Sequence, residues 1–244
     1  GTGWDQRAAD LGYARGQYSV GYSYRYADGV EEDPVEAVKW FRLAAAQGHA
    51  NAQCELGFCY DVGVGLEQDK AEGVKWYRKS AEQGFSQSQH NLGLSYYYGE
   101  GIGRDLTEAV RWFWLAAAQD LADAQFFLGI CYAQGEGIKE DQVEAARWYR
   151  KAADQGQSGA QCNLGACYAL GQGLDKDLRA AVQWYRLSAD QGYSNAQYNL
   201  GMCYLNGNGV MRRKSQAKKW LQMAAEQGDE DALEELKQRG WYKG

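Results

Sequence analysis

The spacing of one tryptophan constrains this chain more than any other feature. Trp40, Trp76, Trp112, Trp148, Trp184 and Trp220 follow one another at intervals of 36 residues, with no insertion or deletion. A Leu-Gly pair, Leu128-Gly129 for example, recurs in step, with Val20-Gly21 in the first copy. A fixed period of this length is typical of repeat architectures, in which each unit packs on its neighbours. The sequence therefore predicts six copies, at residues 14–49, 50–85, 86–121, 122–157, 158–193 and 194–229.

Each copy is predicted to contain two helices. In the first helix, Ala124, Leu128 and Tyr132 recur at i, i+4 and i+8, which places them on one face that we expect to point into the core. Gly129 lies beside this stripe, although glycine costs roughly 1 kcal/mol of helix propensity relative to alanine. We therefore expect the recurring glycine to allow close packing of the second helix.

The second helix begins at a recognisable cap. Asp33 is followed three residues later by Glu36, and this capping box recurs through Asp141 and Glu144. In the fifth and sixth copies Ala180 and Arg213 interrupt the pattern, which predicts weaker caps there. Ala37, Trp40 and Ala44 with their equivalents are predicted to form the inward stripe. The second helices end in Gln-Gly, whose glycine is suited to a left-handed cap. The third copy has Gln119-Asp120 instead, which predicts a slightly strained cap.

Partial copies flank the six complete ones. Trp4 lies 36 residues before Trp40, so residues 4–13 are interpreted as the remains of a preceding second helix. Residues 230–240 predict a charged helix that covers the last exposed core face, as solenoids require. The chain is thus predicted to form a single repeat domain over residues 1–244.

The motif A-x-A-Q-x-x-L-G-x-x-Y-x-x-G-x-G, followed by D-x-x-E-A-V-x-W-Y-R-x-A-A-x-Q-G, resembles the Sel1-like repeat, a relative of the tetratricopeptide repeat. The resemblance covers residues 4 to about 240. It implies an all-α fold, a right-handed α/α superhelix whose first helices line the concave surface. It also implies scaffold or adaptor work. Some bacterial members are secreted and cysteine-rich, and the resemblance to them implies an alternative, a hydrolase or binding protein for β-lactam or peptidoglycan-like substrates.

Composition narrows the range of partners. A net charge of -6 argues against nucleic acid or an anionic membrane as the main partner, because both require a concentrated basic field. The basic cluster at 212–219 is interpreted as a solvated helix face. No apolar run is long enough for a membrane span. We therefore expect no nucleic-acid binding and no membrane insertion.

The six cysteines are predicted to be free thiols. Cys54 and Cys59 are five residues apart on one helix, so they lie about 140° apart around its axis and should not bridge. Cysteines at one repeat position in neighbouring copies are separated by on the order of 9 Å or more, which is also too far. Free thiols favour a cytoplasmic location, while a secreted or periplasmic origin with a removed leader stays open.

The sequence contains no complete arrangement of catalytic residues that we recognise. A nucleophile pair of Cys54 with His90 is conceivable, but no third group or oxyanion hole is specified. Metal-ligand spacings such as C-x-x-C and H-x-x-x-H are absent from the sequence. The prediction is a protein that is not an enzyme and that has no metal site and no cofactor.

Candidate binding residues are those of the first helices that avoid the core stripe. Their types vary between copies and mix aromatic, amide and charged groups, as recognition surfaces do. The predicted residues are Tyr18, Tyr22, Tyr26, Arg25, Glu55, His90, Asn91, Leu94, Tyr98, Phe127, Ile130, Gln134, Asn163, Asn199 and Met202.

Two interpretations of the asparagines among them stay open. Asn91, Asn163 and Asn199 share one repeat position, and an amide both donates and accepts, which suits a peptide backbone. Alternatively they bond to neighbouring helices or water. The leading prediction is a non-enzymatic scaffold that binds a peptide or protein segment in the groove of the first helices. An array that serves only for self-association or assembly within a larger protein is a further alternative.

Overall fold

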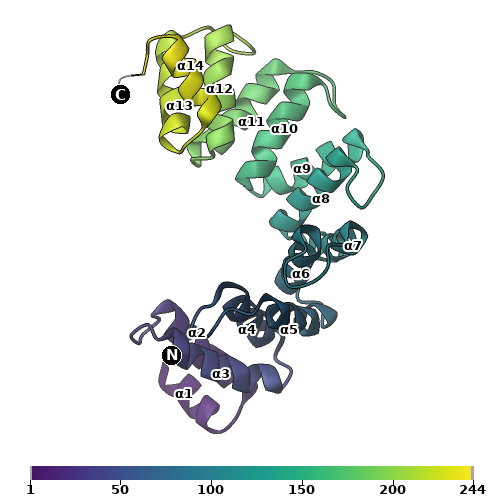
Figure 1. Ribbon diagram of the computed structural model, residues 1–244, viewed down its shortest axis with the longest axis vertical. Helices are drawn as coiled ribbons and strands as arrows, with labels where there is room; N and C mark the ends of the chain where they lie inside the picture. The colour runs from purple at the N-terminus through teal and green to yellow at the C-terminus, as the bar shows by residue number, and fades with distance from the viewer. Residues whose placement is uncertain (1, 243–244) are drawn as a thin grey trace. The chain divides into compact units, whose positions relative to one another are not determined.

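The computed structural model describes residues 2–242, and within that range every regular element is a helix. The helices form two compact units, unit 1 up to Leu121 and unit 2 from Ala122 onward. Figure 1 shows consecutive helices within each unit packed side by side and joined by short loops. The predicted all-α solenoid of two-helix repeats is confirmed.

Unit 1 holds one second helix followed by three complete helix pairs. The second helix is α1 (Thr2–Asp10), and the pairs are α2 (Ala14–Tyr26) with α3 (Pro34–Ala46), α4 (Ala50–Val62) with α5 (Lys70–Glu82), and α6 (Ser86–Tyr98) with α7 (Leu106–Ala117). The helix predicted over residues 4–13 is therefore present as α1.

Unit 2 holds three complete pairs followed by one first helix. The pairs are α8 (Ala122–Gln134) with α9 (Gln142–Asp154), α10 (Ser158–Leu170) with α11 (Leu178–Asp190), and α12 (Ser194–Asn206) with α13 (Lys214–Glu226); the last helix is α14 (Glu230–Gln238). Ala232 and Leu236 of α14 are buried against Leu221 and Ala224 of α13, as expected for a terminal cap.

The second helices are capped by aspartate, but the predicted capping box is only half right. The Asp33 carboxylate accepts a hydrogen bond from the backbone N–H of Glu36 at 2.9 Å. The second bond of a capping box would run from the N–H of Asp33 to the Glu36 side chain, but this N–H donates instead to the carbonyl of Tyr24 at 2.9 Å. The Glu36 carboxylate pairs instead with Lys39, one turn further along.

The same cap recurs along the chain with one exception. Asp177 accepts from the N–H groups of Arg179 and Ala180, so the weaker cap predicted there is wrong: alanine at the third position costs no bond to the aspartate. At α13 no side-chain hydrogen bond caps the helix, as predicted from Arg213.

The mid-helix glycine is a packing residue, as predicted. A Cβ added at Gly57 would stand 2.7 Å from the ring of Tyr77, and one added at Gly129 would stand 2.4 Å from the ring of Tyr149. Real Cβ atoms do not approach a ring so closely. The glycine therefore allows the aromatic ring of the second helix to lie flat against the first helix of the same repeat.

The cap predicted to be strained has the expected backbone. Asp120 adopts a φ of 60°, whereas Gly84 at the equivalent position adopts 91°. Only glycine enters this left-handed region without steric cost, although aspartate tolerates it better than most residues.

The tryptophans lie less deep than predicted. Trp112 and Trp220 are 4% and 5% exposed, but Trp40, Trp76 and Trp184 are only half-buried and Trp4 is 82% exposed. The residue after Trp40, Trp76 or Trp184 points about 100° away around the helix, toward the first helix of its own repeat, and is buried. Trp76 instead packs against a cluster that combines Phe41 of the preceding repeat with Leu56 of its own repeat. The tryptophan thus belongs to the seam between repeats.

A buried glutamine network, which the sequence analysis did not predict, also links the repeats. Gln83 at the end of α5 donates to the Gln53 side chain of α4 at 2.7 Å. Gln53 in turn donates to the carbonyl of Ala45 in the preceding repeat at 3.2 Å. The pattern recurs through Gln191 and Gln161 in unit 2. Gln53 and Gln161 therefore each hold their repeat to the one before it, within the same unit, by a directional hydrogen bond.

Candidate functional site

The predicted binding residues lie on the first helices, and nearly all of them reach the surface. Tyr22, Tyr26, Tyr98 and Gln134 are exposed. The others except His90 are half-buried: Tyr18, Arg25, Glu55, Asn91, Leu94, Phe127, Ile130, Asn163, Asn199 and Met202. The surface formed by these residues within each unit is called the first-helix face below.

His90 is the exception, because it is buried. Its side chain is 5% exposed, and its ring centre lies 5.7 Å from that of Phe113. Cys54 and Cys162 occupy the same repeat position and are buried as well. This position points between consecutive first helices rather than outward, which is why the prediction that His90 lies on an exposed face was wrong.

The asparagines of the first-helix face have partners within the chain. A hydrogen bond from Asn91 opposes the rise that burial causes in the pKa of Tyr77, and Asn163 does the same for Tyr149. Asn199 donates to the Cys162 sulfur at 3.7 Å. All three asparagines therefore interact with neighbouring helices, and Asn91 and Asn199 also line cavities described next.

A cavity recurs between consecutive repeats on the first-helix face. Each copy has one wall from a second helix and another from the first helix of the next repeat. The first cavity, of about 250 Å³, is lined by Asp5, Tyr18, Ser19, Tyr22, Ser23 and Asp28. The second, of about 280 Å³, is lined by Phe58, Asp61, Tyr77, Asn91, Leu94, Ser95, Tyr98 and Glu100. The third, of about 320 Å³, is lined by Ala169, Leu170, Lys176, Leu178, Ala181, Tyr185, Asn199, Met202, Cys203 and Asn208.

The three cavities are built from the same repeat positions. Tyr77, Asn91 and Glu100 of the second cavity correspond to Tyr185, Asn199 and Asn208 of the third. The same positions of the first cavity hold Asp5, Ser19 and Asp28. The fold therefore supplies one cavity repeatedly, and the residue types at its walls differ from copy to copy.

Between the first two cavities, the equivalent place in unit 1 is filled by Arg25. Its guanidinium lies 4.6 Å from the ring centre of Phe58 and 5.2 Å from that of Tyr26. Nε of Arg25 lies 3.4 Å from the Glu55 carboxylate, and the Arg25 side chain is only 12% exposed. Burial raises the pKa of Glu55, and Arg25 opposes that shift by stabilising the charged carboxylate.

The second cavity is acidic. Burial raises the pKa of the Asp61 carboxyl above its ordinary value, Lys70 opposes the rise, and Glu100 adds to it. Lys70 forms its ion pair with Glu100, at 2.7 Å between Nζ and Oε2. Asp61 and Glu100 thus share one nearby cation.

The walls of the third cavity carry no carboxylate. Lys176 is their charged residue, and Met202 and Cys203 stand where the second cavity has Leu94 and Ser95. The two cavities share their architecture and differ in charge.

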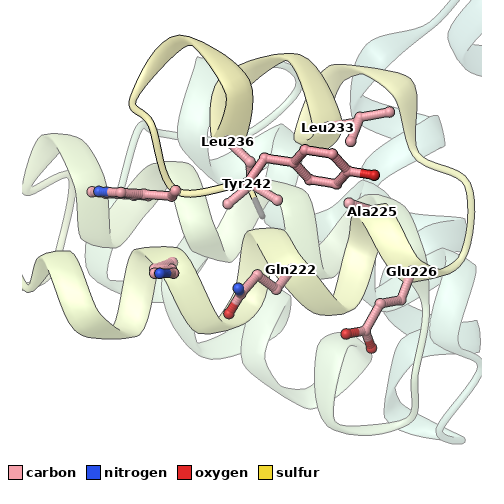
Figure 2. A pocket seen from close by; sticks show the side chains of 8 residues that line it. Gln222, Ala225, Glu226, Leu233, Leu236 and Tyr242 are labelled. Atoms are coloured by element: carbon pink, nitrogen blue, oxygen red, sulfur yellow. The ribbon is translucent and has the colours of Figure 1, made fainter. Parts of the chain in front are cut away.

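A separate pocket of about 370 Å³ lies near the C-terminus of unit 2. Figure 2 shows Tyr242 between Leu233 and Leu236 of α14 and Ala225 of α13. Trp241 packs against the buried pair Leu221 and Leu236. This arrangement covers the apolar end of unit 2, and we interpret the pocket as part of the terminal cap.

The thiols are unsuited to nucleophilic chemistry. All six cysteines are free, as predicted, and all six are buried. Burial raises the pKa of Cys54 to about 11 and that of Cys131 to about 12. Because the thiolate is the nucleophile, these pKa values leave almost none of it at neutral pH.

Neither a metal cluster nor a membrane-spanning helix is found in residues 2–242. Within that range no group of three or more His, Cys, Asp and Glu side chains could hold a metal ion. Over the same residues no helix is both long and apolar enough to cross a membrane.

Five residues of the cavity walls were not predicted as site residues: Asp5, Asp28, Asp61, Tyr77 and Glu100. Asp61 occupies the same repeat position as Arg25, which was predicted, so variation at that position was a usable signal. The contribution of Tyr77 could not be found in this way, because Tyr77 is buried like a core residue and yet lines the cavity.

The geometry defines an α-solenoid repeat protein with variable cavities between its repeats. The Sel1 repeat family model matches residues 14–49, 50–85, 86–121, 122–157, 158–193 and 194–229, the same six windows that the tryptophan period predicts. The chain belongs to the Sel1 repeat family. Proteins of this family commonly act as scaffolds for protein interactions.

Solved structures agree with this assignment. The crystal structure of c5321, described as a protective antigen present in uropathogenic Escherichia coli strains, is 38% identical with a TM-score of 0.86; the match covers 95% of this chain and 50% of that chain. A Sel1 repeat protein from Oxalobacter formigenes is 33% identical with a TM-score of 0.82, covering 90% of both chains.

More distant matches show the fold alone. The immunity protein Pa5087 from Pseudomonas aeruginosa is 20% identical with a TM-score of 0.54, over 90% of this chain and 83% of that one. The comparison with curated proteins gives no match.

Proposed function

We propose that the first-helix face binds a peptide or a protein segment, and that the protein acts as a scaffold rather than as an enzyme. The observation that carries this proposal is the recurrence of one cavity between consecutive repeats, with a constant framework and variable walls. An extended segment that runs along the first helices of unit 1 would meet the first and second cavities, which lie two repeats apart with the Arg25 interface between them. Its side chains would be recognised one cavity at a time.

The nature of the walls supports a protein ligand. Tyr22 and Tyr98 are 41% and 58% exposed, and tyrosine offers a large apolar ring with a polar tip at low entropic cost. Asn91 and Asn199 lie in the cavity walls, where an amide side chain can bond to a passing backbone in addition to its internal partner.

The hydrolase alternative gains no support from the side chains. A covalent nucleophile must be activated by a neighbouring base or by a lowered pKa. The thiols have raised pKa values, and His90 is buried against Phe113. A covalent adduct with a β-lactam, detected by mass spectrometry of the intact protein, would nevertheless favour that alternative.

Selection from a displayed library of random peptides tests the proposal. Selected peptides are expected to lose binding to a first-helix variant carrying Tyr98→Ser and Asn199→Ala. They should keep binding to a control variant with Leu43→Ser and Leu187→Ser, two residues that are each 50% exposed on second helices. Circular dichroism confirms that both variants are folded.

The opposite dependence would place binding on the second helices and overturn the proposal. Failure to select any peptide, together with concentration-dependent oligomers in light scattering, would favour the self-association alternative.

A further inference from the structure

One interface of unit 1 already shows how the recurring cavity holds a cation. Arg25 crosses from α2 to the next first helix, where its guanidinium lies over Phe58 and beside the Glu55 carboxylate. Tyr26 reaches the same carboxylate with its hydroxyl, at 3.4 Å. An aromatic face with an adjacent carboxylate is a favourable setting for a guanidinium, because stacking and charge-assisted bonding act together.

The next interface has the same framework without the internal cation. Asp61 stands at the repeat position of Arg25, and Asn91 and Leu94 stand at those of Glu55 and Phe58. The space that the arginine fills in the preceding interface is here the open second cavity. In the preceding interface the carboxylate, Glu55, lies opposite the arginine. Here the carboxylate, Asp61, takes the place of the arginine, so a cation would have to come from a ligand.

The charges of the second cavity fit such a cation. Asp61 and Glu100 bring two carboxylates, and the nearby Lys70 is already bonded to Glu100. A partly buried carboxylate is costly to ionise when its one nearby cation is shared, and burial raises the pKa of the Asp61 carboxyl despite Lys70. The ring of Tyr98 and the ring of Phe58, which Arg25 already contacts, line the same cavity, and aromatic rings attract a planar cation.

We propose that the second cavity, between α4, α5 and α6, binds an arginine side chain of a partner protein, with Asp61 as the counter-charge. The inference rests on the proposed function and adds the chemistry of the ligand. Arginine is favoured over lysine because the planar guanidinium both stacks on aromatic rings and bonds in a fork to a carboxylate. The first cavity, with Asp5 and Asp28, extends the acidic character of unit 1 along the same face.

A titration of the full chain with N-acetylarginine amide, followed by NMR, tests the proposal. The side-chain amide of Asn91, in the cavity wall, is the reporter. N-acetylcitrulline amide has nearly the same shape without the charge and serves as the ligand control. We expect the arginine derivative to shift the Asn91 amide and the citrulline derivative to bind at least about tenfold more weakly, since hydrogen bonds to charged groups are the stronger kind.

Three variants locate the site. Asp61→Asn removes the charge at constant shape and should weaken arginine binding about tenfold. Asp61→Arg places an arginine at the repeat position of Arg25 and should abolish binding by filling the cavity and removing the counter-charge. Glu82→Gln removes a charge from the exposed end of α5, outside the cavity, and should leave the affinity unchanged.

Each result decides the matter. Equal binding of the two derivatives, undiminished binding to Asp61→Asn, or no shift at Asn91 would overturn the inference. The proposed function fails separately. If selected peptides bind the first-helix face equally well in the Asp61→Asn variant and carry no arginine, the face is a binding surface and only its ligand chemistry is wrong.

Discussion

The second and third cavities, one in each unit, are the same structure with different chemistry. Both are walled by a tyrosine of the second helix and an asparagine of the next first helix, Tyr77 with Asn91 and Tyr185 with Asn199. Around this shared frame the second cavity carries Asp61 and Glu100, whereas the third carries Lys176 and Asn208.

The difference shows how a repeat protein separates stability from recognition. The glycine against the aromatic ring, the aspartate cap and the buried glutamines recur in both units and fix the backbone. The variable wall positions, those of Asp61 and Glu100, lie outside this set and hold different residues in the second and third cavities on the same backbone. Selection on a repeat array can therefore alter one cavity at a time.

The largest expected effect comes from the shared framework. Trp112→Ala in unit 1 and Trp220→Ala in unit 2 should each cost about 3–5 kcal/mol, because both rings are nearly buried between repeats. Trp4→Ala should cost far less, since Trp4 is 82% exposed. Thermal unfolding monitored by circular dichroism compares the three. Equal melting temperatures for the three variants would contradict the predicted dependence on burial.

A second, smaller effect concerns the wall of each cavity. Gly57→Ala and Gly165→Ala should each destabilise by about 1–3 kcal/mol, because the new methyl would stand 2.7 Å from the ring of Tyr77 or Tyr185. Gly103→Ala is the control, since its Cβ would meet nothing within 4 Å. Denaturant unfolding measures all three. If Gly103→Ala destabilised the protein while Gly57→Ala and Gly165→Ala did not, this account of the packing would be contradicted.

Thiol reactivity should distinguish the two cavities. Cys203 lines the third cavity, where the second has Ser95, and is 8% exposed, while Cys131 is fully buried. Burial raises the pKa of Cys203 to about 11, so at pH 8 only about one thiol in a thousand is ionised. We expect slow reaction of the native protein with a chromogenic disulfide reagent, with Cys203 labelled first.

The controls for this reaction are the denatured chain and Cys203→Ser. In denaturant all six cysteines should react at once. If the variant retains the first reaction phase, as judged by peptide mapping, the third cavity is less open to the reagent than its walls suggest.

The smallest expected effect is the pH dependence carried by Asp61. Burial raises its folded-state pKa above the ordinary 3.8, so folding prefers the protonated carboxyl. The resulting stability is fully present below pH 3.8 and is lost as pH rises through the folded pKa. Relative to Asp61→Asn, the wild type should lose stability over that window.

Lys70 and Glu100 face Asp61 and are kept unchanged in this comparison. In a pH titration followed by NMR, the midpoint of the shift of the Asp61 carboxyl resonance should lie above pH 3.8. It should fall when N-acetylarginine amide is added. A midpoint at or below 3.8 would show that the carboxylate is already well compensated.

Much of the architecture could be predicted from the sequence because it is periodic. The tryptophan spacing fixes the repeat boundaries, Gly129 reports close helix packing, and Asp141 reports a helix start. The depth of Trp40 could not be predicted, because the periodicity of one helix does not tell which of two adjacent inward residues faces its own repeat and which faces the next.

The site was predicted as a surface but not as cavities. Asn91, Leu94 and Tyr98 were recognised because their repeat positions vary, and all three line the second cavity. His90 was misplaced because its direction depends on how closely consecutive first helices pack. The contribution of Tyr77 depends on packing between helices and leaves no signal in the sequence.

The central claim is that residues at the cavity walls, on a common frame, determine what each cavity binds. An exchange variant tests it directly: Asp61→Ala empties the second cavity of its counter-charge, while Ala169→Asp with Lys176→Gln gives the third the residues found at Asp61 and Gln68. We predict that N-acetylarginine amide shifts the Asn91 amide in the wild type and the Asn199 amide in the exchange variant. Shifts that stay at Asn91, or that appear at neither amide in the wild type, would contradict the account.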